Sequence, residues 1–434
     1  MTRILLRAPK DPFEVVDAEQ TLEQNLIGDN AGNLVFIEAA HKLLSVPGVE
    51  IEVDRFKTHR RLAGRINERY DAYVIPLANA FRPSFTAQLE RMTALIERLR
   101  IPVVVLGVGA QATLGYDWSR LAPMEASIRA FVRAVLDRGP SIGVRGELTH
   151  DYLRSLGFSD VEVVGCPSMF LWGEDLRVTK RLPALAPDSR VAITVSPYVA
   201  AMGPVVRRHV EAYPNLTYIA QDLASLQRLL WGESAEEAAR TSDVPVHLSH
   251  PLYRDDKTRL FLDPWPWIAE LRAQDFAFGT RIHGTIAALL AGTPGVVLAH
   301  DSRTLELARY FGIPHRKMTE VGPDVDAAEL YAEADFAALC AGHAARFATF
   351  TGYLARHGLD HAFAHDGVAA AWDERMAGTP FPAAIRHAAT FVAPSGPRAR
   401  LRRARFEARA AARRSGLKRR PADALRRLRG PGGC

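Results

Sequence analysis

The sequence predicts an α/β protein of two Rossmann-like, doubly wound domains that face a cleft, followed by a basic C-terminal tail. Short runs of Val, Ile and Leu recur with helical segments between them, and they do not alternate with polar residues. Such runs are typical of parallel strands covered on both faces. Two prolines and an Asp-Ser pair at 181–190 interrupt this rhythm near the middle of the 434 residues. We therefore expect domains at 1–185 and 186–380 and a tail at 395–434.

The first domain has apolar runs that predict strands near 3–8, 48–56, 71–78, 101–110 and 161–168. Residues with helical spacing predict helices near 34–44, 84–99, 125–138 and 147–156. The second domain repeats the pattern, with strands predicted near 191–197, 216–222, 244–250, 276–280 and 295–301. Helices are expected at 302–311, where Gly312 is the stop signal, and over most of 323–353.

The second domain contains the stretch that organises the functional prediction, Thr280-Arg281-Ile282-His283-Gly284, at a junction between strand and helix. Such a junction presents free N–H groups and suits an anion. If strand geometry persists to His283, the period of two places Arg281 and His283 on one side of the chain. Gly284 then belongs to the same substrate-binding junction. The alternative is structural, with Arg281 paired to a carboxylate and His283 acting as a cap or packing residue.

Arg145 ends a short strand and occupies the same kind of junction in the first domain. Basic residues at strand ends of both domains make a shared cleft the natural site. The alternative for Arg145 is an ion pair with Glu147 or Asp151.

Two glycine-containing turns supply further candidates. The loop 28–32, which opens a helix, offers Asp29 and Asn30 to an anion or a sugar, although an ordinary turn capped by Asn33 fits it too. Gly107 and Gly109 match the dinucleotide fingerprint GxGxxA after a strand. The match is weak because the strand is late in the domain and a loop follows it, so we assign the two glycines to substrate binding only.

Charge and cysteine content limit the class of protein. From Arg398 to the end there are 14 Lys and Arg against two acidic residues, so the tail is strongly basic and the remainder is mildly acidic. Such a tail is a solvated segment, a contact to anionic membrane or, least favoured, a contact to nucleic acid. Three widely separated cysteines and the lack of a dense His and carboxylate set predict no disulfide framework and no metal. Without a signal peptide or membrane span, we expect a cytoplasmic protein, peripheral to the membrane if the tail binds it.

Five blocks in this order resemble the polysaccharide pyruvyl transferase family. They are the loop from Asn25 to Gly32, VVVLGVGAQ, SIGVRGELTHDYLRSLGF, VEVVGCPSMFL, and GTRIHGTIAALLAGTPGVVLAHDSRTLELARYFGIP, the last being the most specific. The resemblance implies an architecture similar to two-domain GT-B glycosyltransferases. Many relatives have Asp-Pro where this chain has Cys166-Pro167, so the role of that acid does not carry over.

The resemblance also implies transfer of pyruvate from phosphoenolpyruvate onto two hydroxyls of a saccharide, free or lipid-linked, as a cyclic ketal. Arg145 and Arg281 would hold the phosphate and carboxylate, and His283 would be the acid, its charged form favoured by anionic neighbours. Asp29 would bind or deprotonate an acceptor hydroxyl. No cofactor is expected. The alternatives are a GT-B glycosyltransferase that uses a nucleotide sugar and a non-catalytic scaffold of the same fold.

Overall fold

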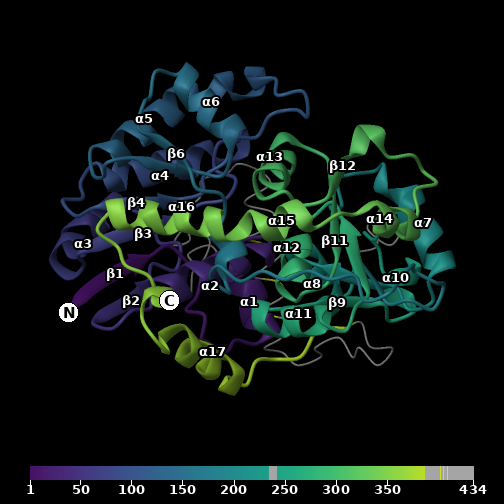
Figure 1. Cartoon of the computed structure of the whole chain (residues 1–434). Coiled ribbons are helices and arrows are strands. Elements are labelled where there is room, and N and C mark those ends of the chain that lie inside the picture. Colours follow the sequence, from purple (N-terminus) through teal and green to yellow (C-terminus); the bar gives the residue numbers. More distant parts are fainter. Residues whose placement is uncertain (234–241, 387–400, 402–403, 405–407, 409–434) are drawn as a thin grey trace, which may run out of the picture.

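The computed structural model describes residues 1–233 and 242–386, together with residues 401, 404 and 408. Two parallel sheets, each flanked by helices, lie side by side (Figure 1). The predicted tail at 395–434 therefore lies almost wholly outside the described residues. Within the described part, no helix is long and apolar enough to cross a membrane.

The N-terminal sheet is parallel, with strand order β2-β1-β3-β4. A parallel pair, β5 and β6, continues from it, because Val108 bridges Val144 beyond the end of β4. The strands are β1 (Thr2–Leu6), β2 (Val49–Val53), β3 (Ala72–Pro76), β4 (Val103–Leu106), β5 (Ile142–Val144) and β6 (Val161–Val163). The helices are α1 (Ala18–Gln24), α2 (Gly32–Leu44), α3 (Ala63–Arg69), α4 (Thr86–Ile96), α5 (Glu125–Leu136) and α6 (Glu147–Ser155), with short 3₁₀ turns at Arg60–Leu62, Pro83–Phe85, Trp118–Met124 and Pro167–Phe170.

The C-terminal sheet is parallel, with strand order β12-β11-β10-β7-β8-β9. Its strands are β7 (Val191–Thr194), β8 (Thr217–Ala220), β9 (Thr258–Leu260), β10 (Phe276–Gly279), β11 (Gly295–Ala299) and β12 (His315–Lys317). The chain therefore winds outward from β7 to one edge and returns through β10 to the other. In this doubly wound order, ligands bind at the carboxyl ends of the two central strands, β7 and β10.

Ten helices of this half are described. They are α7 (Met202–Ala212), α8 (Leu223–Trp231), α10 (Pro251–Arg254), α11 (Pro264–Leu271), α12 (Ile282–Leu290), α13 (Ser302–Phe311), α14 (Ala327–Glu333), α15 (Ala337–Ala341), α16 (His343–Arg356) and α17 (Val368–Gly378). The fold class predicted from sequence is confirmed in that the structure contains two doubly wound α/β domains with parallel sheets.

One predicted strand, at 244–250, is wrong. The segment forms turns that lead into α10, and the strand of this region is β9, which the sequence did not indicate. Pro245 lacks a backbone donor for a sheet. The His250 side chain accepts from the Leu252 N–H and starts α10, and the His247 ring bonds the Ser242 carbonyl at 2.9 Å. Local bonds between side chain and backbone thus replace the strand.

The two domains share one hydrophobic core. Val35 and Phe36 of α2 belong to the same buried cluster as Ile193 of β7 and Ile286 of α12. After the C-terminal sheet, the chain returns to the N-terminal domain, where α16 lies across the strands of the first sheet (Figure 1). There the buried Tyr353 hydroxyl donates to the Val105 carbonyl at 2.8 Å and accepts from the Gly143 N–H at 3.0 Å. The domain limits of 1–185 and 186–380 remain predictions, while the structure shows α16 in contact with the first sheet.

We predict that Tyr353→Phe destabilises the protein by about 1–3 kcal/mol, because it leaves the buried Gly143 N–H without its partner. Chemical denaturation measures this change. Thr349→Ala, on the exposed side of the same helix, is the control and should have a much smaller effect. Equal stability of Tyr353→Phe and the parent would show that the two hydrogen bonds of the Tyr353 hydroxyl contribute nothing to the free energy of unfolding.

Candidate functional site

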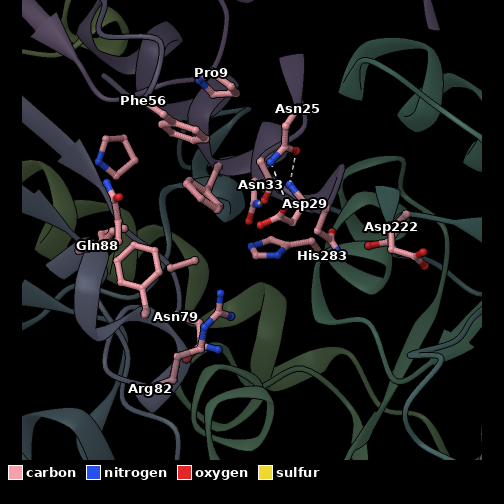
Figure 2. Close-up of a pocket in the computed structure, with 18 of the residues that line it drawn as sticks. Pro9, Asn25, Asp29, Asn33, Phe56, Asn79, Arg82, Gln88, Asp222 and His283 are labelled. Atoms are coloured by element: carbon pink, nitrogen blue, oxygen red, sulfur yellow. Dashed lines mark hydrogen bonds between the residues drawn. The ribbon is translucent and has the colours of Figure 1, made fainter. Parts of the chain in front are cut away.

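A cavity of about 1050 Å³ lies between the domains and is lined by residues of both. The C-terminal domain supplies side chains from loops that follow β7, β8, β10 and β11, as the doubly wound order requires. The N-terminal domain supplies the loop before α2, the loops that follow β1, β2 and β3, and Arg145. Figure 2 shows part of this lining, with His283 between Gln88 of the N-terminal domain and Asp222 of the C-terminal domain.

Arg145 lies on the cavity wall, although it is only 1% exposed. Its guanidinium donates to the Gly107 carbonyl at 3.3 and 3.4 Å. Among the described residues it has no ion pair with Glu147, Asp151 or any other carboxylate. Burial lowers its pKa below the usual value for arginine. The alternative that Arg145 pairs with Glu147 or Asp151 is therefore wrong. Its charge remains available to a ligand.

Gly107, Gly109 and Gly284 are not among the residues that line the cavity, and their assignment to substrate binding stays a prediction. A Cβ on Gly109 would lie 2.5 Å from Arg145 Cδ, and one on Gly284 would lie 2.5 Å from Thr194 Cγ2. Gly107 has a φ of +71° and no room for a side chain beside the Gly165 carbonyl. The three glycines permit close packing behind the site, and the first two fix the position of Arg145.

Arg281 and His283 both line the cavity, but not for the reason predicted from the strand period. The strand β10 ends at Gly279 and α12 begins at Ile282, so Arg281 is the residue before the helix and His283 lies in its first turn. The Arg281 Nε donates to the Val195 carbonyl at 3.4 Å, and the guanidinium lies 3.6 Å from Asp222. The helix start, and not continued strand alternation, brings the two side chains to one cavity.

His283 is 9% exposed and lies in a cationic environment. Its ring contacts Phe36, with centroids 5.5 Å apart, and its Nε2 lies 3.7 Å from Cys166 Sγ. Burial, followed by the positive charges of Arg145 and Arg303, lowers the pKa of His283 to about 3. The expectation of anionic neighbours is therefore wrong for the protein alone. The imidazole is neutral at pH 7 until a ligand brings negative charge.

The loop 28–32 crosses from one domain to the other. The Ala31 N–H donates to the Gln221 carbonyl at 2.8 Å, and Asn30 forms a backbone bridge with Asp222. Asp29 has a φ of +71°, lines the cavity and is held by Asn25, whose amide donates to its carboxylate at 2.8 Å. Asn30 also lines the cavity, while its side chain accepts from the Gly32 N–H. The loop thus presents both predicted residues to the cavity.

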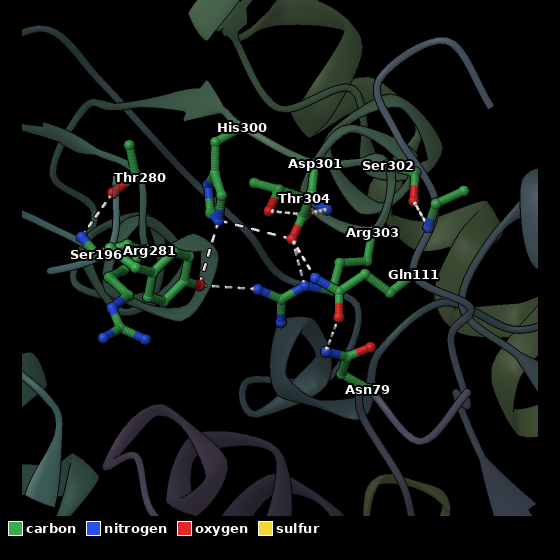
Figure 3. A network of polar contacts seen from close by, with 12 residues as sticks. Asn79, Gln111, Ser196, Thr280, Arg281, His300, Asp301, Ser302, Arg303 and Thr304 are labelled. Carbon is green, nitrogen blue, oxygen red and sulfur yellow. Dashed lines mark hydrogen bonds and ion pairs between the residues drawn. The ribbon is translucent and has the colours of Figure 1, made fainter. Parts of the chain in front are cut away.

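A polar network that follows β11 was not predicted from the sequence. Arg303 donates to Asp301 at 2.7 Å and to the Tyr198 hydroxyl at 3.3 Å, and His300 lies between these two partners (Figure 3). Arg303 and Tyr198 line the cavity. Arg303 was open to prediction, because it follows a strand end just as Arg281 does. Arg82 was also missed. It follows β3, and its Nε is buried without a hydrogen-bond partner.

Positive charge dominates the cavity. Its lining has eight cationic side chains and two carboxylates, Asp29 and Asp222. The cations are Arg7, Arg55, Lys57, Arg82, Arg91, Arg145, Arg281 and Arg303. Among the described residues there is no group of three or more His, Cys, Asp or Glu arranged to hold a metal ion. This arrangement suits a small molecule with several negative charges.

Fold and cavity together define a two-domain α/β protein with a positively charged cavity between the domains. The family model for polysaccharide pyruvyl transferase matches residues 30–302. The chain therefore belongs to the polysaccharide pyruvyl transferase family and is a transferase.

Solved structures with similar folds have low sequence identity. The UDP-GlcNAc 2-epimerase of Methanocaldococcus jannaschii, in complex with UDP-GlcNAc and UDP, is 10% identical, with 77% of this chain and 94% of that chain covered and a TM-score of 0.44. MnaA of S. aureus with UDP is 12% identical, with 80% and 94% covered and a TM-score of 0.42. Alr3699/HepE of Anabaena with UDP is 12% identical, with 87% and 99% covered and a TM-score of 0.37. A comparison with curated proteins finds no match.

We predict that Gly109→Ala weakens binding of inorganic phosphate to the cavity, because the added methyl displaces the Arg145 side chain. Titration calorimetry measures the affinity, and circular dichroism checks the fold. Gly64→Ala, where no atom lies within 4 Å of the added methyl, is the matched control and should bind as the parent does. Unchanged phosphate affinity in Gly109→Ala would mean that Arg145 does not contribute to anion binding.

Proposed function

We propose that the enzyme transfers pyruvate from phosphoenolpyruvate to two hydroxyls of a saccharide, forming a cyclic ketal. One observation carries the proposal. In a member of the pyruvyl transferase family, Arg145, Arg281 and Arg303 line the same interdomain cavity as His283, which forms no ion pair with a carboxylate of the described residues.

Phosphoenolpyruvate matches this charge pattern, because it has a phosphate and a carboxylate attached to the same carbon, C2, of a small skeleton. Arg145 and Arg281 come from different domains, so they approach such a ligand from two sides. Their planar guanidiniums form forked, charge-assisted bonds to both kinds of anion. Arg303 adds a third positive group, oriented by Asp301 and Tyr198.

The proposed chemistry begins with addition of an acceptor hydroxyl to C2 of the donor. His283 gives its proton to the methylene carbon, which becomes the methyl group, while the hydroxyl loses its own proton. The C2–O bond to phosphate then breaks, inorganic phosphate leaves, and the second hydroxyl adds to C2 with loss of its proton. The negative charge of the bound donor raises the pKa of His283 from its low value and allows the ring to hold the proton it delivers.

Asp29 is the proposed partner of the acceptor. Its carboxylate lies on the cavity wall and is exposed. From there it binds an acceptor hydroxyl or removes its proton. The amides of Asn30 and Asn33 line the same part of the cavity and offer hydrogen bonds to further hydroxyls.

We predict that His283→Ala binds phosphoenolpyruvate nearly as the parent does and turns over about 10²–10⁴ times more slowly, because only the acid is lost. Arg281→Lys should lose affinity despite keeping its charge, since the fork is lost. Calorimetry and phosphate release measure the two effects. Arg177→Lys, with a side chain 88% exposed, is the control. Full turnover by His283→Ala or Asp29→Asn would remove that residue from its role.

The assay also separates the alternative of a nucleotide-sugar glycosyltransferase. A pyruvyl transferase releases phosphate from phosphoenolpyruvate when the acceptor is present and consumes no nucleotide sugar. Consumption of a nucleotide sugar without phosphoenolpyruvate would favour the glycosyltransferase.

We further propose that the acceptor is lipid-linked and that the basic tail holds the enzyme at the cytoplasmic face of an anionic membrane. Each Lys or Arg near such a surface contributes about 1 kcal/mol. A protein truncated before Arg398 should keep its catalytic rate on a water-soluble acceptor and lose co-sedimentation with anionic vesicles at low salt. If the truncated protein still co-sediments, the tail is not the anchor.

A further inference from the structure

The cavity extends well beyond the space that the donor needs. Arg145, Arg281 and His283 mark one part of it, and a second wall comes wholly from the N-terminal domain. In Figure 2, Phe56 and Gln88 of this wall lie on the far side of His283 from Asp222. The wall consists of side chains from the loop after β2, from the segment between β3 and α4, and from α4 itself, namely Phe56, Lys57, Arg82, Phe85, Gln88 and Arg91.

Three cations of this wall lack an acidic partner. Among the described residues, Lys57, Arg82 and Arg91 form no ion pair with a carboxylate, whereas Arg7 lies 3.6 Å from Asp54 and Arg55 lies 2.9 Å from Glu14. Burial and the nearby charge of Arg303 lower the pKa of Arg82, whose Nε is buried and unbonded. Arg82 is partly buried, whereas Lys57 and Arg91 are exposed. Three like charges on one wall repel each other, so a bound anion stabilises the wall.

The wall is held in a fixed shape. Arg91 donates to the Gln88 side chain at 2.6 Å, Gln88 donates to the Thr58 hydroxyl at 3.0 Å, and Arg7 donates to the same hydroxyl at 3.2 Å. Arg55 and Phe56 are both in the left-handed region, with φ of +52° and +54°. Two consecutive strained residues at a cavity indicate that the loop geometry is functional.

Asp54 maintains that strained loop. Its carboxylate accepts from the Phe56 N–H at 2.8 Å, the Ala8 N–H at 3.1 Å and the Tyr73 hydroxyl at 2.7 Å. Phe56 is thereby set under the Arg7 guanidinium, 4.4 Å from it, with the ring on the cavity wall. The rings of Phe56 and Phe85 add apolar faces of the kind on which sugar rings stack.

We propose that this wall is a subsite for a phosphorylated acceptor saccharide, with Lys57, Arg82 and Arg91 holding its phosphate or diphosphate. The inference rests on the proposed function, since it names the class of acceptor. A neutral sugar would leave three like charges uncompensated, whereas a diphosphate spreads its charge over several donors. Binding there leaves the sugar to reach from the wall toward His283 and the donor.

Inorganic pyrophosphate is the probe, titrated calorimetrically into the full-length protein that is already saturated with phosphoenolpyruvate. The parent should bind it, and Lys57→Ala/Arg91→Ala should bind it on the order of 10-fold or more weakly, because each lost bond joins charged groups. The affinity for phosphoenolpyruvate should change less than 2-fold. Arg98→Ala, an exposed arginine just beyond the end of α4 whose side chain bonds the Ala94 carbonyl, is the matched control.

The outcomes separate this inference from the proposed function. If phosphoenolpyruvate does not bind, the proposed function fails, whatever pyrophosphate does. If it binds, but pyrophosphate binds only in its absence or equally well to the double variant, the phosphate subsite is wrong. Two competitors then identify the source of the phosphate. Displacement of pyrophosphate by UDP supports a nucleotide-linked acceptor, displacement by a short-chain prenyl diphosphate supports a lipid-linked one, and displacement by neither overturns the subsite.

Discussion

Positive charge held between two domains is the constraint on which the site depends. Arg145 is almost fully buried, and in the described part of the chain its guanidinium bonds only the Gly107 carbonyl. Burial makes its charged form costly. Arg303 is paired with Asp301, and Arg281 lies 3.6 Å from Asp222. These two carboxylates relieve only part of the repulsion among the three arginines. The protein therefore keeps a cavity whose most favourable occupant is an anion.

The two doubly wound sheets make this arrangement possible. Each sheet directs the carboxyl ends of its strands to one edge, and the shared core holds these edges against each other. The loop 28–32 is bonded to the backbone around Asp222, and α16 is bonded to β4, so the two halves of the site are fixed at several points. Rigid placement matters here because a charge displaced by an ångström loses much of its effect on a reacting centre.

Burial is the main cause of the low pKa of His283, and the positive charges of Arg145 and Arg303 lower it further. Its Nε2 lies beside Cys166 Sγ, and among the described residues the ring forms no ion pair with a carboxylate. With the donor bound as proposed, its negative charge offsets these positive charges. In the proposed function, the histidine is therefore charged only when the donor whose carbon it protonates is in place.

Much of this was open to prediction from sequence, and the failures have physical reasons. Apolar runs and a strand-to-helix junction were enough to predict both domains and the shared location of Arg145, Arg281 and His283. A sequence pattern cannot reveal which charges surround a buried ring, so the prediction of anionic neighbours for His283 was wrong. The prediction of a strand at 244–250 failed because the hydrogen bonds of the His247 and His250 side chains to the backbone outweigh the apolar pattern of the sequence. Arg82 was missed because it lies in a loop several residues beyond its strand.

In the proposed function, anion binding in the cavity gives His283 its proton. Calorimetry near pH 7, in buffers of different ionisation enthalpy, measures the proton uptake that should accompany binding of phosphoenolpyruvate. The free ring is neutral at this pH, and bound negative charge raises its pKa, so the parent should take up more protons on binding than His283→Gln. Subtracting the variant removes any proton that the phosphate itself loses to the arginines. Identical proton linkage in the two proteins would contradict the account.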